Sequence, residues 1–151
     1  MRNPVIHNRT RYAAWRAPLD ALLVLLFTYA ALSKLLDYAN FRVQMENQVF
    51  PAGINLALFY GLPPLELAAG LMLVLPHCSC AGRRLSLVLL AGFTAYVALV
   101  MLHFWHRVPC SCGGILGKLK WGPHLLLNVF FLLVTLASIY LERKERRTGA
   151  A

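Results

Sequence analysis

Four long apolar segments constrain this chain more than any other feature of its sequence. They run from Leu19 to about Leu36, from about Ile54 to Pro76, from about Leu85 to Trp105, and from His124 to about Leu141. A helix needs about 20 mostly apolar residues to cross the roughly 30 Å hydrocarbon core of a bilayer, and each segment is about that long. We therefore predict an all-α fold, a polytopic membrane protein with a bundle of four transmembrane helices.

The composition supports a bilayer as the surroundings. Hydrophobic residues make up 59% of the chain and charged residues 14%, whereas soluble domains have roughly half and a quarter. The net charge of +9 comes largely from basic residues that flank the apolar segments: Arg2, Arg9, Arg11, Arg16, Arg143, Lys144, Arg146 and Arg147. Because no basic stripe alternates with aromatic residues on a soluble face, we expect no nucleic-acid partner.

The distribution of lysine and arginine predicts the orientation. An even number of spans places both termini on one side. The second loop, with Arg83 and Arg84, is basic like the termini, whereas the first has only Arg42 and the third only Arg107, Lys118 and Lys120. We expect a bacterial inner-membrane protein with a basic cytoplasmic N-terminus over 1–18, a membrane domain over 19–141 and a basic cytoplasmic tail over 142–151.

Two local features qualify these segments. A cleaved signal peptide that ends near Tyr29 is the alternative for the first segment, but its apolar run continues through Leu36. In the second segment Pro63 and Pro64 lack amide donors, so we expect a short piece over 54–60 and a new helix from Pro63. Glu66 would then lie in the first turn, at the positive end of the helix dipole.

Two Cys-Ser-Cys groups flank the third segment. About 21 helical residues separate Cys80 from Cys110, or about 30 Å, so no disulfide can join the two groups. Cys110 and Cys112 would face the oxidising, extracytoplasmic side, and Cys78 and Cys80 the reducing cytoplasm. A ring closed by cysteines one residue apart is strained, and Gly113 and Gly114 leave the loop open to a partner, so the outer pair suits thiol exchange.

Both cysteine pairs also allow roles without thiol exchange. Cys110 and Cys112 could form a stable structural disulfide, or bind a metal with His103, His106 or His124. For Cys78 and Cys80 we favour small, buried or interfacial thiols without a function, although the adjacent His77 also allows a cytoplasmic metal or thiol role.

Several ionisable side chains fall within the outer half of the spans, where charge is costly and often functional. Lys34 ends the first span and could pair with Glu66, while His124 and Asn128 share a face of the fourth. The functional interpretation is a polar pocket beneath the thiol loop. There His124 or Lys34 favours the thiolate and Glu66 orients a group or exchanges a proton. Alternatively, Lys34 snorkels, Glu66 caps a helix and the histidines lie at headgroup level; Trp121 would be an interfacial anchor.

Four stretches together carry a family resemblance: "ALSKLLDYANF", "PPLELAAGLML", "VPCSCGGIL" and "LKWGPHLLLNVFF". From about Asp20 to Leu141 the chain resembles the DoxX-like membrane proteins, and most of all their methylamine-utilisation branch, MauE. The resemblance implies a four-helix membrane bundle associated with redox chemistry, which assists disulfide formation in the exported small subunit of methylamine dehydrogenase. It extends to these residues: Lys34, Glu66, Cys110, Cys112, Trp121, His124 and Asn128.

The predicted function is thiol-disulfide exchange with an exported or periplasmic thiol protein. By analogy with other four-helix thiol oxidases, a quinone held near Lys34, Glu66, His124 and Asn128 would reoxidise the cysteines. One alternative is a non-enzymatic assembly factor whose cysteine pair is structural. Another is a small metal-binding membrane protein or transporter.

Overall fold

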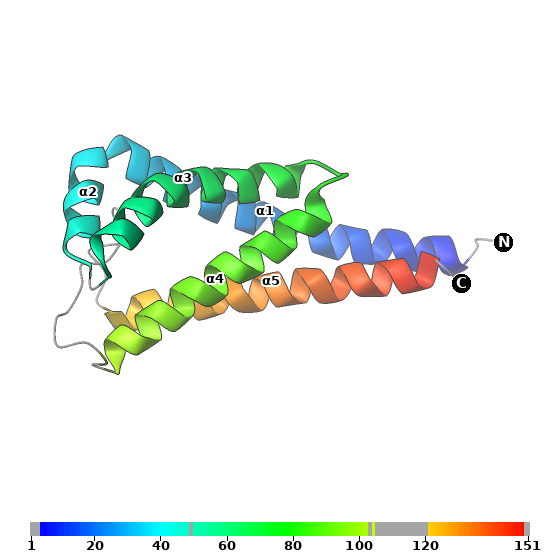
Figure 1. The fold of residues 1–151 in the computed structure, drawn as a ribbon. Helices are drawn as coiled ribbons and strands as arrows, with labels where there is room; N and C mark the ends of the chain where they lie inside the picture. The colour runs from blue at the N-terminus through cyan, green and yellow to red at the C-terminus, as the bar shows by residue number, and fades with distance from the viewer. Residues whose placement is uncertain (1–3, 49, 103, 105–120, 150–151) are drawn as a thin grey trace.

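The computed structural model describes residues 4–48, 50–102, 104 and 121–149, and every regular element in these ranges is a helix (Figure 1). The elements are α1 (Pro4–Leu36), α2 (Tyr38–Glu46), α3 (Ala52–Val74), α4 (Ser79–Met101) and α5 (Trp121–Gly149). The helices α1, α3, α4 and α5 are long and apolar enough to cross a membrane. The predicted all-α, multi-pass architecture is therefore confirmed.

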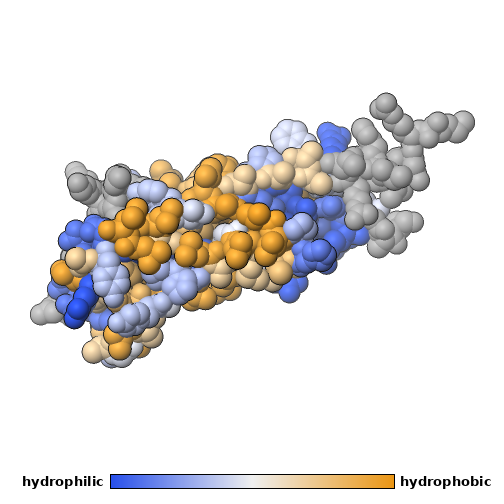
Figure 2. Space-filling model, turned by 90° about the horizontal axis from the view of Figure 1, so that it is seen from above, coloured by the Kyte–Doolittle hydropathy of each residue, from blue (hydrophilic) through white to orange (hydrophobic). Residues whose placement is uncertain are grey.

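The four long helices form a ring of neighbours. The first, α1, packs against α3 and α5, and α4 packs against the same two helices. Side chains from all four meet in one apolar core: Leu23, Phe27, Ala69, Leu73, Leu90 and Val134. The start of α1 and the end of α5 lie at one end of the bundle and α2 lies at the other (Figure 1). In Figure 2 an apolar band occupies the middle of the visible face, with polar residues toward both ends.

The helices extend beyond the apolar segments that predict them. The first helix begins at Pro4 rather than Leu19, α4 begins at Ser79 rather than Leu85, and α5 continues to Gly149. Hydropathy reports only the part of a helix inside the hydrocarbon core, whereas a helix can continue into water when its charged residues pair. At the end of α5, for example, Arg146 pairs with Glu142 one turn earlier, 2.7 Å apart.

The short helix α2 was not predicted. Phe41 and Met45, one helical turn apart, face inward and cluster with Phe59 of α3. The Phe41 and Phe59 rings stack with their centroids 5.2 Å apart. The apolar pair at i and i+4 in an otherwise polar stretch was the available signal for an amphipathic helix that covers one end of the bundle.

The break expected in the second span is wrong. The helix α3 runs without interruption from Ala52 to Val74, and both Pro63 and Pro64 lie inside it. Membrane helices tolerate proline because local adjustment and neighbouring helices satisfy the freed carbonyl groups. Glu66 is therefore far from the first turn, and the predicted contact with the positive end of the helix dipole does not exist.

Candidate functional site

Lys34 of α1 and Glu66 of α3 form a buried ion pair. The Lys34 Nζ donates to both carboxylate oxygens of Glu66, at 2.9 and 3.0 Å, and also to the Ala30 carbonyl oxygen, at 3.1 Å. Only 5% of Lys34 and 1% of Glu66 is exposed. The expected pairing is confirmed, and the alternative in which Lys34 snorkels to the interface is wrong.

The pair satisfies a strict electrostatic requirement. A single charge in a bilayer core costs several kcal/mol, and an ion pair offsets this cost when hydrogen bonds complete it. Both carboxylate oxygens of Glu66 accept from the ammonium group, so the pair is compact and neutral overall. It also joins the C-terminal part of α1 to the C-terminal half of α3.

His124 and Asn128 lie elsewhere. One turn apart on α5, both line a cavity of about 400 Å³ whose other lining residues come mainly from α1, α3 and α4, with Met45 from α2. Neither Lys34 nor Glu66 lines that cavity, although their neighbours Ser33 and Leu65 do. The single polar pocket predicted from the sequence is thus two adjacent sites, a closed ion pair and a cavity.

The cavity walls are mainly apolar. Leu62, Phe93 and Val97 are typical of them, and a few polar residues also line the cavity. Two of these interact: the Tyr96 hydroxyl donates to the Gln48 side-chain oxygen. An apolar chamber with a few convergent polar groups is the usual form of a small-molecule site.

Cys110 and Cys112, the thiols predicted to face the extracytoplasmic side, lie outside the described residues, as do His103 and His106. The described residues nearest to them in the chain are Phe104, just past α4, and Trp121, the first residue of α5. Both helix ends lie opposite the bundle end that carries the start of α1 and the end of α5 (Figure 1).

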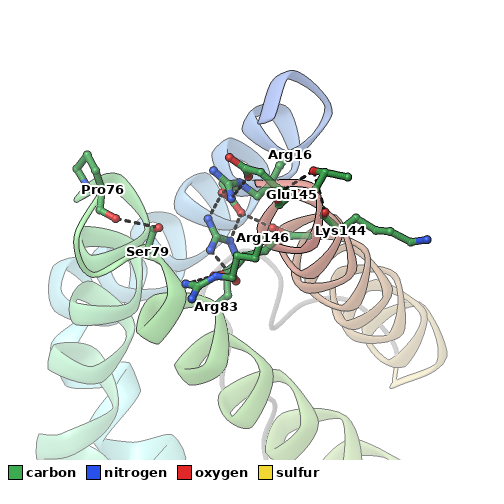
Figure 3. Close-up of polar contacts among 11 residues, drawn as sticks. Arg16, Pro76, Ser79, Arg83, Lys144, Glu145 and Arg146 are labelled. Atoms are coloured by element: carbon green, nitrogen blue, oxygen red, sulfur yellow. Dashed lines mark hydrogen bonds and ion pairs between the residues drawn. The ribbon is translucent and has the colours of Figure 1, made fainter. Parts of the chain in front are cut away.

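A second buried polar cluster, not predicted from the sequence, lies at the bundle end that carries the chain termini. Arg83 of α4 is 1% exposed and donates from Nε and Nη2 to the Asp20 carboxylate of α1, at 3.2 and 3.0 Å. Its Nη1 lies 2.9 Å from the Glu142 carboxylate of α5. In Figure 3, Arg83 reaches from α4 toward α1 and α5. One guanidinium thus ties three helices together.

Neighbouring groups extend this Arg83 cluster. The Ser138 hydroxyl donates to Asp20 at 2.5 Å, and Arg16 lies 2.7 Å from Glu145. The sequence pattern places Arg83 in a charged loop, but the residue is buried within α4. Asp20, Arg83 and Glu142 begin or end spans on the same predicted side, and that coincidence of depth was the signal available.

Cys78 and Cys80 are free thiols at this same end, half-buried at the start of α4. The Cys80 side chain lies close to the Glu142 carboxylate. Within the described ranges, no group of three His, Cys, Asp or Glu side chains is arranged to hold a metal ion. The 23 residues of α4, about 34 Å of helix, run from these thiols to the helix end that precedes Cys110 and Cys112 in the sequence.

Comparison with known proteins adds a family to this geometry. Neither the curated proteins nor the solved structures include a significant match. The family described as methylamine utilisation protein MauE matches residues 11–141, which contain all four long apolar helices apart from the two charged ends. The chain is therefore a multi-pass membrane protein that belongs to the MauE family of methylamine utilisation proteins.

Proposed function

We propose that this protein promotes disulfide formation in an exported partner by thiol-disulfide exchange at Cys110 and Cys112. One observation supports the proposal: α4 ends and α5 begins at the end of the bundle where His124 and Asn128 line a cavity, and the sequence between these two helices contains both cysteines. Membership of a methylamine-utilisation family supports it. The resemblance to that family implies a role in disulfide formation in the exported small subunit of methylamine dehydrogenase.

The proposed exchange has two balanced steps. A thiolate of the partner attacks one sulfur of the Cys110–Cys112 disulfide, which forms a mixed disulfide and releases the other cysteine as a thiolate. A second partner thiolate then attacks the mixed disulfide, which leaves the partner oxidised and both cysteines reduced. The strained bond of a Cys-x-Cys pair favours this direction.

The described residues have distinct proposed roles. A positive charge near a thiolate lowers the pKa of the thiol and makes the sulfur a better leaving group, and His124, three residues into α5, is the candidate for that role. The Lys34 and Glu66 side chains are already engaged with each other, so we assign them a positioning role, which keeps α1 against α3 beside the cavity.

The decisive experiment replaces the cysteines. With the small subunit of methylamine dehydrogenase as the exported probe, Cys110→Ser and Cys112→Ser should each abolish disulfide formation, and one of them should accumulate a mixed disulfide with the probe. Cys78→Ser/Cys80→Ser is the matched control and should leave oxidation intact. If the Cys110→Ser/Cys112→Ser variant still supports oxidation of the probe, the protein is a non-enzymatic assembly factor.

Thiol labelling of intact cells tests the compartment independently. A membrane-impermeant maleimide should label Cys110 and Cys112 only after reduction, and should not label Cys78 and Cys80 at all. Labelling of both pairs under the same conditions would contradict the proposed topology.

A further inference from the structure

The cavity beside His124 and Asn128 exists because two helices diverge. At the turn that joins them, α3 and α4 touch: a Cβ added to Gly82 would lie 2.9 Å from the backbone nitrogen of Leu73. Away from that turn the two ribbons separate like the arms of a V (Figure 1). The cavity of about 400 Å³ lies in the open part of the V, with α1 and α5 as its floor.

Two glycines keep this space empty. Gly61 of α3 and Gly92 of α4 both line the cavity, and a Cβ added to either would meet no atom within 4 Å. At the rim, Leu65 is 46% exposed and Val88 is 67% exposed. These rim residues belong to membrane-spanning helices, so the cavity opens sideways toward lipid rather than toward water.

Two polar side chains of α5 line the otherwise apolar cavity. The Nδ2 of Asn128 is buried and has no hydrogen-bond partner in the part of the chain that the structure describes. His124 lines the cavity one turn before it on α5. A buried amide donor is costly without an acceptor, and a pure hydrocarbon chain offers none. A carbonyl oxygen at one end of an otherwise apolar molecule would satisfy Asn128.

These features select one class of occupant. The molecule must be lipid-soluble, carry a carbonyl acceptor at one end and place an apolar tail between Leu65 and Val88. We propose that the cavity is the binding site of a prenylated quinone, with a ring carbonyl at Asn128 and the isoprenoid tail passing between α3 and α4 into the bilayer.

The redox role of this site rests on the function proposed above. After each exchange the thiols of Cys110 and Cys112 give up two electrons and two protons as their disulfide reforms. A quinone that accepts two electrons and two protons becomes a quinol, so the exchange balances without another reactant. The described polar residues nearest the bound ring, Asn128 and His124, would hold and orient its carbonyl group.

Binding is measured first, independently of any thiol chemistry. The full-length protein in lipid nanodiscs is titrated with a short-chain benzoquinone that carries two isoprene units, and in parallel with the matching isoprenoid hydrocarbon. We expect one quinone per chain and at least about tenfold weaker binding of the hydrocarbon, since it cannot accept from Asn128. Equal binding of the two probes would overturn the proposal and identify a site for lipid acyl chains.

Matched variants locate the site. Gly61→Leu/Gly92→Leu fills the cavity without a backbone clash and should abolish quinone binding. Gly53→Leu, at the exposed start of α3, also adds a side chain where a Cβ meets no neighbour and should bind like the natural chain. Asn128→Leu should weaken the quinone about tenfold and leave the hydrocarbon unchanged. Unchanged quinone binding in the glycine double variant would overturn the proposal. The proposal would also be overturned if the natural chain forms a dimer that the glycine double variant dissociates, because a second copy of the chain would then occupy the cavity.

Failure of this proposal is distinguishable from failure of the proposed function. Cys110→Ser/Cys112→Ser should retain quinone binding, because the cavity contains neither cysteine. If the probe protein is oxidised but no quinone binds, the thiol chemistry is right and the acceptor is wrong. If quinone binds but the probe is oxidised without the cysteines, the quinone site is supported and the exchange mechanism is contradicted.

Discussion

At the scale of single residues, a buried charge depends on its ion-pair partner far more than an exposed charge does. Lys34 and Glu66 are almost fully buried, so each charge relies on the other. The Arg42–Glu46 pair of α2 has the same separation, 2.9 Å, but its side chains are 67% and 63% exposed. Water screens an exposed pair of this kind, and its contribution to stability is about 0.2–1 kcal/mol.

This contrast predicts the effect of neutralising one partner. Glu66→Gln leaves the Lys34 charge buried without its carboxylate and should lower the free energy of unfolding by about 3–5 kcal/mol, measured by thermal unfolding in detergent. The matched control Glu46→Gln should change it by less than about 1 kcal/mol. Lys34→Met/Glu66→Leu removes both charges and should restore most of the loss. Equal effects of Glu66→Gln and Glu46→Gln would contradict the buried pair.

At the scale of the elements, the closed end of the V depends on one glycine. The α3 and α4 backbones approach so closely at Gly82 that a Cβ there would lie 2.9 Å from the Leu73 nitrogen and 3.0 Å from the Met72 backbone. Backbone atoms cannot rotate away as a flexible side chain can. The angle between α3 and α4, and with it the cavity, therefore depends on Gly82.

The change Gly82→Ala should destabilise the fold by about 1–3 kcal/mol, because the new methyl group forces the two helices apart. Gly92→Ala on the same helix is the control: its added Cβ meets nothing, and alanine should raise helix stability by about 0.5–1 kcal/mol. Thermal unfolding of both variants, followed by circular dichroism, measures the difference. A Gly82→Ala variant as stable as the natural chain would show that α3 and α4 do not touch there.

The sequence predicts a helix correctly where local properties of the chain determine it, and fails where packing against other helices does. Hydropathy predicts all four spans, because crossing a bilayer sets the length of an apolar helix. The rule that proline ends a helix fails at Pro63 and Pro64, since neighbouring helices compensate a local loss of hydrogen bonds. Hydropathy fails for α2, whose stability comes from packing Phe41 and Met45 on Phe59.

At the scale of the whole molecule, the polar ends of the bundle differ in composition. The end with the chain termini carries the Arg83 cluster and the basic tail, whereas the other end carries α2 (Figures 1 and 3). Burial of Arg83 removes one positive charge from those that predict orientation, but Arg84 is exposed and the basic termini remain. The prediction that both termini are cytoplasmic therefore keeps its electrostatic basis.

Fusions test this orientation directly. Green fluorescent protein attached to either terminus should fluoresce, because it folds in the cytoplasm and not after export by the general secretory route. Alkaline phosphatase fused after Asn47, at the end of α2, should be active, because disulfides of the enzyme form only outside the cytoplasm. Fluorescence from only one terminus would contradict the four spans, and an inactive fusion at Asn47 would invert the orientation.

The sequence by itself determines the membrane architecture, the family pattern and which thiols are candidates for exchange. Each of these depends on local quantities: the length of an apolar run, the spacing of charges and a short motif. Only the tertiary structure decides that Lys34 and Glu66 close on each other while His124 and Asn128 face a separate cavity, and that Arg83 joins Asp20 to Glu142. These arrangements depend on the rotation and crossing of the helices. Packing between distant segments, such as the contact at Gly82, sets both, and no local pattern encodes it.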